Sequence, residues 1–161
     1  MSKQTLPITK KGIEKIQAEL DNLLKVEREE LKRTIAEARE LGDLKENAEY
    51  HSAKEKQSLV EGRISYLQSV IATSQVIDVS SVKSEKIVFG ATVHLNDVEK
   101  DEPMTVMIVG KEESDRKEGK ISYDSPLGRA LIGKEEGDTV IVKAPKGDIE
   151  YEVESFEFID K

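Results

Sequence analysis

Two acidic side chains, Asp43 and Glu46, stand three positions apart in a short polar segment between two stretches of helical pattern. Carboxylate oxygens are hard ligands suited to Mg²⁺, which usually keeps several waters and takes only one or two protein carboxylates besides phosphate oxygens. Two carboxylates alone would form an incomplete magnesium site, which another molecule would have to complete. The spacing also fits a capping box, in which both side chains satisfy backbone N–H groups at the start of the second helix. Both interpretations stay open, because one oxygen of Asp43 can cap while the other faces outward.

The stretch before these carboxylates has the apolar period of one long helix. Thr9 can cap its start, with Ile8 and Ile13 at the spacing of a hydrophobic staple. Apolar residues then recur in steps of three and four, and Gly42 can end the helix in a left-handed conformation. The charged run 27–30 interrupts the apolar stripe, so we expect the seam to shift there.

A second helical pattern follows, and its one apolar face carries Ala53, Val60, Ile64, Leu67 and Ile71. Two amphipathic helices joined at a single glycine must double back as an antiparallel hairpin. The narrow apolar stripe suits a two-helix coiled coil. Roughly thirty helical residues at about 1.5 Å each give an arm on the order of 45 Å long, with the two carboxylates at its far end.

From residue 75 the apolar period becomes that of strands. Residues 75–79 are predicted to form a short strand and residues 80–85 a linker. We therefore predict two domains, an N-terminal coiled-coil hairpin at 1–79 and a C-terminal domain at 80–161.

The C-terminal domain is predicted to be a small antiparallel sheet with one short helix. The predicted strands are 87–89, 91–95, 104–109, 120–123, 139–143 and 149–158, with a hairpin turn at 145–148. Ser125 is the expected N-cap of the helix, Pro126 its first residue, and Gly133 lies just past its end. The predicted fold class of the whole chain is α+β.

Composition excludes several classes of protein. The net charge is −8, with 36% charged residues and no cysteine, so a disulfide scaffold or a Cys-based zinc site is excluded and a cytoplasmic location is expected. No apolar run approaches the ~20 residues that span a bilayer, and the Met-Ser-Lys start is unlike a secretion signal. Residues 1–79 carry 13 Lys and Arg against 14 Asp and Glu, whereas residues 80–161 carry 12 against 19. Any approach to nucleic acid is therefore expected from the first half, without sequence-specific contact to DNA.

Several separated motifs, in the same order, give the chain a family resemblance. The segment 37–51, Glu-Ala-Arg-Glu-Leu-Gly-Asp-Leu-Lys-Glu-Asn-Ala-Glu-Tyr-His, closely resembles the hairpin tip of the GreA/GreB family of bacterial transcript cleavage factors. Residues 6–12 resemble the opening of that family and residues 88–91 the beginning of its second domain. Ser125-Pro126 together with 131–136 resemble its C-terminal signature. The resemblance covers nearly the whole chain.

The resemblance implies a partner protein that performs the chemistry. In this family the coiled coil enters the secondary channel of RNA polymerase, while a C-terminal domain with an FK506-binding-protein-like fold docks at the channel rim. Transferred by position, Asp43 is a ligand of a second Mg²⁺ shared with the polymerase, and Glu46 assists the metal or the attacking water. The polymerase then cleaves the 3′ end of backtracked RNA, so the protein itself is not an enzyme.

The family also suggests two contact surfaces. Arg39 and Lys54 are expected to hold extruded RNA through its phosphates, although a solvated helix face is an equally open interpretation. The loop Asp124-Ser125-Pro126 is expected to contact the polymerase rim, besides its local role as a turn and helix cap.

Three other functions remain as alternatives. An inhibitor paralogue that plugs the polymerase channel would have an altered tip, whereas Asp43 and Glu46 are both present here. Prolyl isomerisation is suggested only by fold analogy. Besides Phe156 and Phe158 near the end, only three aromatic residues are expected to be able to line an apolar pocket, Phe89, Tyr123 and Tyr151. A self-pairing coiled-coil adaptor would form oligomers, whereas we expect a monomer whose hairpin satisfies its own seam.

Overall fold

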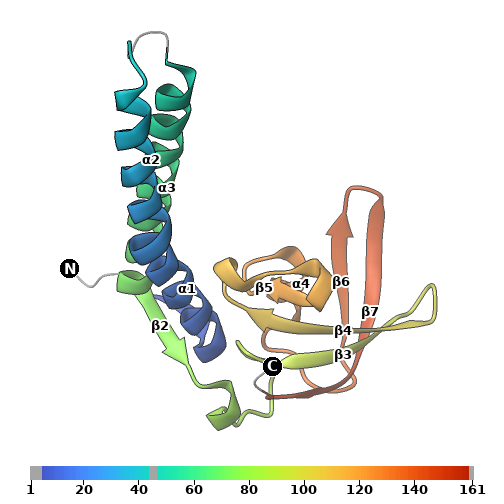
Figure 1. Ribbon diagram of the computed structural model, residues 1–161. Coiled ribbons are helices and arrows are strands. Elements are labelled where there is room, and N and C mark those ends of the chain that lie inside the picture. Colours follow the sequence, from blue (N-terminus) through green and yellow to red (C-terminus); the bar gives the residue numbers. More distant parts are fainter. Residues whose placement is uncertain (1–4, 44–46, 160–161) are drawn as a thin grey trace. The chain divides into compact units, whose positions relative to one another are not determined.

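The computed structural model describes residues 5–43 and 47–159 (Figure 1). Internal contacts divide the chain into two compact units. One, the arm unit, is Glu14–Thr73, and the other, the sheet unit, combines Met1–Ile13 with Ser74–Lys161. Residues 5–13 thus belong with the C-terminal sheet by their contacts, whereas the sequence boundary between residues 79 and 80 stays a prediction.

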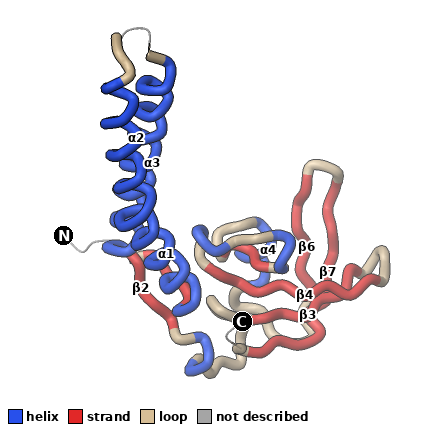
Figure 2. Tube along the Cα trace, in the orientation of Figure 1, coloured by secondary structure: helices blue, strands red, loops and turns tan. Residues whose placement is uncertain are grey.

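The arm unit is the predicted antiparallel helical hairpin (Figures 1 and 2). Its first limb begins within α1 (Lys10–Asn22), of which residues 10–13 belong to the sheet unit, and continues through a π-helical turn η1 (Leu23–Glu27) and α2 (Arg28–Glu40). Its second limb is α3 (Ala48–Thr73), which packs along α2 and η1. No helix in the described part of the chain is long and apolar enough to cross a membrane.

The π-helical turn explains how the interrupted stripe still forms one seam. Leu23 and Leu31 are both buried, although eight positions in an unbroken α-helix would turn the second side chain about 80° away from the first. One extra residue in the turn restores the phase, so Ile35 and Ala38 continue on the same face. The predicted shift of the seam is therefore confirmed, and it begins slightly before the charged run 27–30.

Two bidentate ion pairs lie across the seam. Arg28 donates to both carboxylate oxygens of Glu61, at 2.9 and 2.7 Å, and this pairing lowers the pKa of Glu61. Arg63 donates to Glu19 from the opposite limb, with a shortest distance of 2.8 Å. Both ion pairs form together in only one alignment of the two antiparallel limbs, so they help to fix that register.

A two-stranded parallel sheet brings the start of the chain to the sheet unit. Strand β1 (Leu6–Thr9) pairs with β2 (Ser74–Ile77), in a register that sets Leu6 opposite Ser74. The strand predicted at 75–79 is confirmed with slightly different bounds. Strand β1 was not predicted, because its four residues also fit the staple that precedes a helix.

The main sheet has five strands in the order β5-β4-β3-β7-β6 (Figure 2). The strands are β3 (Thr92–Asp97), β4 (Glu102–Val109), β5 (Lys120–Ser122), β6 (Thr139–Ala144) and β7 (Gly147–Glu157). Three neighbouring pairs are antiparallel, as predicted, and β5 is the exception because it runs parallel to β4. The fold class is α+β.

The strand predicted at 87–89 is wrong, although the burial that suggested it is real. Ile87 is fully buried, and its backbone pairs with the loop after the short helix rather than with a strand. Its N–H donates to the carbonyl of Lys134 at 2.8 Å, and its carbonyl accepts from Gly133 at 2.7 Å. The apolar run therefore packs without joining the sheet.

One face of the sheet packs against the short helix α4 (Pro126–Leu131) to form the core. The buried members of this core are Ile87, Ala91, Val93, Leu95, Val106, Ile108, Leu131, Val140 and Val153. Val79 is also fully buried, in a smaller cluster with Met107 and Val109. The residue before the predicted linker is thus anchored in the sheet unit.

Candidate tip and docking sites

The first predicted site begins where α2 ends. The N–H of Leu41 donates to the carbonyl of Ala38 at 3.1 Å, and Gly42 then takes a positive φ of 129°, which a side chain would oppose. The predicted glycine end of the helix is confirmed. Asp43 follows in an exposed position, directly after this change of direction, whereas Glu46 lies outside the described residues.

The cap at the described start of the second limb is Asn47, whereas the predicted capping box of Asp43 with Glu46 involves residues outside the described ones and stays a prediction. The side-chain oxygen of Asn47 accepts the backbone N–H of Tyr50 at 3.0 Å, which makes it the cap of a helix that begins at Ala48. The side-chain NH₂ of Asn47 also donates to the carbonyl of Ala38. One amide therefore caps α3 and joins it to the end of α2.

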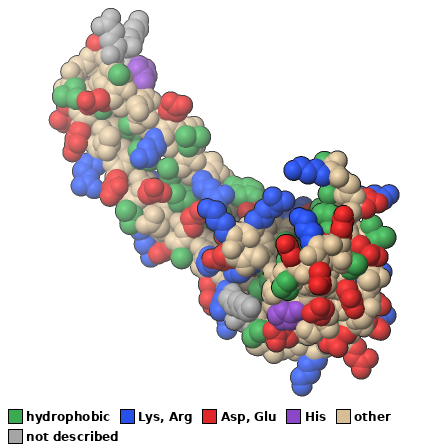
Figure 3. All heavy atoms as spheres, turned by 90° about the vertical axis from the view of Figure 1, so that its right-hand side faces the viewer, with side chains coloured by type: hydrophobic (Ala, Val, Ile, Leu, Met, Phe, Trp, Pro, Cys, Tyr) green, Lys and Arg blue, Asp and Glu red, His purple; other side chains and the backbone are tan. Residues whose placement is uncertain are grey.

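The predicted RNA-contact residues lie on both limbs near the tip. Arg39 is in the last turn of α2 and is exposed. Lys54 is exposed near the start of α3, and its ammonium group donates to the side chain of Gln57 at 3.1 Å. Positive and negative side chains alternate over the arm surface in Figure 3, so contact with RNA at these two residues stays a prediction.

The acidic side chains of the described residues do not form a complete metal site. Within residues 5–43 and 47–159, no group of three or more His, Cys, Asp or Glu side chains could hold a metal ion. The exposed carboxylate of Asp43 offers hard oxygen atoms, which are the donors that Mg²⁺ prefers, and metal binding there stays a prediction.

The second predicted site is the loop between β5 and α4. Each oxygen of the Asp124 carboxylate has its own partner: the hydroxyl of Ser122 donates to one, and the ammonium group of Lys111 lies 3.2 Å from the other. The backbone N–H of Tyr123 donates to the carbonyl of Val109 at 2.9 Å, which ties the loop to the end of β4. Three polar contacts therefore fix the conformation of the loop, with the Ser122 hydroxyl, the Lys111 ammonium group and the Val109 carbonyl.

These contacts change the acidity of Asp124. The hydrogen bond from the Ser122 hydroxyl lowers the pKa of the Asp124 carboxyl, and the positive charge of Lys111 lowers it further. Partial desolvation acts in the opposite direction and is outweighed. The carboxylate therefore stays ionised at lower pH than an ordinary Asp side chain does.

Ser125 and Pro126 begin α4 as predicted. The Ser125 hydroxyl accepts the N–H of Gly128 at 3.1 Å and donates to the carbonyl of Ser122 at 2.6 Å. Pro126 occupies the first turn, where its missing N–H costs nothing. The cap prediction is confirmed, and the contact with polymerase stays a prediction.

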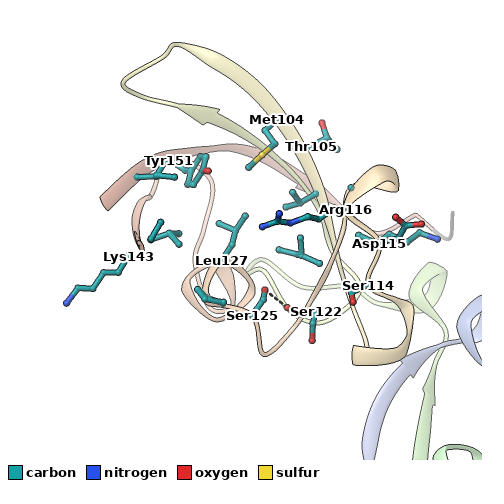
Figure 4. A pocket seen from close by; sticks show the side chains of 18 of the residues that line it. Met104, Thr105, Ser114, Asp115, Arg116, Ser122, Ser125, Leu127, Lys143 and Tyr151 are labelled. Carbon is teal, nitrogen blue, oxygen red and sulfur yellow. Dashed lines mark hydrogen bonds between the residues drawn. The ribbon is translucent and has the colours of Figure 1, made fainter. Parts of the chain in front are cut away.

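Beside this loop the sheet unit has a cavity of about 770 Å³ (Figure 4). Ser125 and Pro126 form part of its edge, and Met104, Leu127 and Tyr151 contribute to its apolar lining. Of the three aromatic residues expected to line a pocket, only Tyr151 does so. Phe89 and Tyr123 instead pack edge to face, with ring centroids 6.0 Å apart.

Basic side chains stand around the apolar lining. Arg116, Lys120 and Lys143 all border the cavity (Figure 4 labels two of them). Asp115 also lines the cavity, and acidic side chains are frequent on the face of the sheet unit that Figure 3 presents. The cavity is therefore a local apolar and basic surface on an acidic unit.

Comparison with known proteins matches both parts of the chain. The family model described as "Transcription elongation factor, N-terminal" matches residues 6–76, and that described as "Transcription elongation factor, GreA/GreB, C-term" matches residues 82–158. The transcription elongation factor GreA of Anaeromyxobacter sp. (strain K) is 51% identical over 158 residues, which covers 98% of this chain and 95% of that protein. The chain belongs to the GreA/GreB family of transcription elongation factors.

Other relatives agree across nearly the whole length. The GreA protein of Alkalilimnicola ehrlichii is 53% identical over 149 residues, covering 92% of this chain and 94% of its own. The solved structure of GreA factor homolog 1 from Thermus thermophilus is 26% identical, with a TM-score of 0.44, and covers 96% of this chain and 99% of that one. The two GreA relatives and the two family models confirm the predicted GreA/GreB membership.

For this GreA/GreB chain, sequence reasoning missed three contributors to the sites. Asn47 was overlooked as a cap, although an Asn before a helical run is a common cap signal. Lys111 could not be assigned to Asp124, because the two are far apart in the sequence and meet only through the parallel pairing of β4 and β5. The cavity had no sequence signal, since its lining comes from several separate strands and loops.

Proposed function

We propose that this chain enters the secondary channel of RNA polymerase and stimulates cleavage of backtracked RNA by the polymerase. The observation that carries the proposal is the position of Asp43. It is exposed beyond the end of α2, and the cap of α3 is supplied by Asn47. An exposed carboxylate at the end of the arm can reach a metal ion held by a partner, which supports a role for Asp43 in the reaction.

Asp43 and Glu46 would act as the chain's contribution to a metal site completed by the polymerase. Mg²⁺ bound there would stabilise negative charge on the oxygens of the in-line displacement at phosphorus. Asp43 supplies a hard anionic oxygen, and Glu46 orients the attacking water or assists the same ligand set. Each role requires a carboxylate oxygen at a fixed distance from the metal ion or the attacking water. The ends of α2 and α3 would therefore contribute by holding the tip in place.

Arg39 and Lys54 would hold the extruded RNA. Their side chains are exposed on the last turn of one limb and near the start of the other. Contacts to phosphates carry no sequence information, which suits a factor that must act on any transcript.

The loop Asp124–Pro126 and the adjoining cavity would dock at the channel rim. Ser125 and Pro126 border the cavity, so one partner segment can contact the loop and the apolar lining together. Arg116 and Lys143 favour a partner segment with acidic as well as apolar side chains. In this arrangement the sheet unit binds the polymerase, the arm supplies the tip carboxylates, and the polymerase catalyses the cleavage. The site of action would be the bacterial cytoplasm.

The test is a stalled elongation complex with labelled RNA 3′ ends. Adding the purified chain with Mg²⁺ should release short 3′ fragments and restore elongation, whereas the chain with Mg²⁺ and RNA but without polymerase should release none. Cleavage of RNA without polymerase would contradict the proposal that the polymerase catalyses the reaction. Inhibition of the complex without cleavage would instead identify a protein that plugs the channel.

A further inference from the structure

The carboxylate of Glu113 joins two segments that lie 104 positions apart in the chain. Its Oε2 atom accepts the backbone N–H of Thr9 at 3.0 Å and that of Gly110 at 2.8 Å, while its Oε1 atom accepts the Thr9 hydroxyl. Thr9 is only 2% exposed. All these residues belong to the sheet unit, so the contacts lie within one compact unit.

Thr9 links this carboxylate to the first helix. The Thr9 hydroxyl oxygen accepts the N–H of Gly12 at 3.0 Å, which makes Thr9 the predicted N-cap of α1. Loss of the Glu113 carboxylate would leave the buried N–H of Thr9 without its acceptor, an arrangement that proteins avoid. The start of the helical arm therefore depends on a side chain from the turn after β4.

Gly12 leaves the space that this arrangement needs. A Cβ atom at Gly12 would collide with the carboxylate group of Glu113. The close approach of helix and carboxylate is thus possible only without a side chain at this position.

The same turn also holds the loop Asp124–Pro126, the proposed docking loop. Glu113 ends the short 3₁₀ helix η3 (Lys111–Glu113), and Lys111 at its other end pairs with Asp124. Building on the proposed function, we infer that Glu113 is a positioning residue, which couples the docking loop to the start of the arm through η3. Without it, α1 would begin from a mobile end while the docking loop keeps its own contacts.

The test measures the arm and the reaction separately. The chain has no cysteine, so Glu30→Cys on α2 and Lys146→Cys in the turn between β6 and β7 give two specific spin-label positions. The distribution of distances between the labels is measured in the parent chain, in Glu113→Ala, and in the control Glu99→Ala, which removes an exposed carboxylate from the turn between β3 and β4. Polymerase affinity and the cleavage rate at saturating factor are measured in the same variants without labels.

We expect Glu113→Ala to broaden the distance distribution and to lower saturated cleavage roughly tenfold, because small misplacement of a reacting group is costly. Polymerase affinity should change far less, and Glu99→Ala should match the parent chain throughout. Glu113→Gln keeps one oxygen acceptor and should recover part of the loss, and it carries the same test if the Ala variant unfolds.

An unchanged distance distribution together with unchanged saturated cleavage would overturn the inference. The inference would also be overturned if Glu113→Ala broadened the distance distribution but left polymerase affinity and saturated cleavage unchanged. The arm would then not need this anchor to stimulate cleavage. If the parent chain itself stimulates no cleavage, the proposed function fails, and the distance distribution still decides whether Glu113 holds the arm.

Discussion

The tip of the arm and the docking loop hold their acidic side chains by different means. Asp43 is placed by two helix ends, because Gly42 turns the chain after α2 and Asn47 caps α3 and joins it to α2. Asp124 is placed by side chains, since Ser122 and Lys111 each contact one of its oxygens. The comparison teaches that the tip should respond to changes along the helical seam, whereas the loop should respond only to its immediate neighbours.

The largest expected effect comes from Asp43→Asn. The change keeps the size of the side chain and removes its charge, so a Mg²⁺ ligand is weakened while the cap at Asn47 is untouched. Cleavage in a stalled complex should fall on the order of a hundredfold, with normal melting and polymerase binding. Added Mg²⁺ should recover part of the loss by mass action.

Two further measurements sharpen the Asp43 prediction. Glu46→Gln should give a milder form of the same loss. Cleavage by Asp43→Asn at the parent rate would show that the tip carboxylate takes no part in the reaction.

A change in the seam should act on the tip from a distance. Leu31 is buried between the limbs, so Leu31→Ala should cost the arm about 2–4 kcal/mol through lost burial and a cavity. Hydrogen exchange should show faster opening of α2 and α3, with the five-stranded sheet unchanged. The control Leu59→Ala removes a side chain that is 70% exposed on α3, and it should change stability by less than about 0.5 kcal/mol. Equal protection from hydrogen exchange in both variants would contradict the claim that burial of Leu31 between the limbs stabilises the arm.

A smaller effect is expected for RNA contact. Changing Arg39 and Lys54 together to Ala should lower cleavage of long extruded RNA roughly tenfold, with a weaker dependence on salt. Briefly backtracked complexes should be affected less, because they present fewer phosphates. The control pair Lys15 and Arg33 removes the same two kinds of charge from other exposed positions of the arm. An equal loss of cleavage in both double variants would indicate a general effect of the arm's charge and no specific RNA contact at Arg39 and Lys54.

The smallest effect is a titration in the docking loop. The pKa of the Asp124 carboxyl is lowered, so its stabilising contribution is fully present above the ordinary value of about 3.9 and is lost as pH falls through the folded value. Carbon NMR of the carboxyl should therefore give a midpoint below that ordinary value. Ser122→Ala and Lys111→Ala should each raise the midpoint, because the hydrogen bond from the Ser122 hydroxyl and the positive charge of Lys111 both lower the pKa of this carboxyl. A midpoint unchanged by either substitution would contradict the contact with that side chain.

Local signals in the sequence predicted the parts of the fold that depend on neighbouring residues. The caps Thr9 and Ser125, the glycine end at Gly42 and the shift of the seam all come from contacts within a turn or two of helix. The tip carboxylate Asp43 was found as a candidate by its residue type and position. Its predicted capping box with Glu46 involves residues outside the described ones, whereas Asn47 caps the described start of α3.

Contacts between distant segments could not be predicted from one sequence. Strand β1 pairs in parallel with β2, and β5 in parallel with β4, and neither pairing follows from local turn chemistry. The partner of Glu113 lies at the other end of the chain, and nothing in the apolar pattern marks the carboxylate as different from its neighbours. The candidate sites were therefore predicted where they depend on one segment and missed where several segments meet.

The π-helical turn in the first limb has a consequence for relatives that differ in length. Because Leu23–Glu27 holds one more residue than an α-helical turn needs, deleting a single residue there would convert it to ordinary helix and keep both halves of the seam in phase. The same deletion in α3 would rotate every apolar residue between the break and the tip by about 100°. A one-residue gap in an alignment is thus harmless at this turn, whereas in the opposite limb it marks a hairpin with a different pairing.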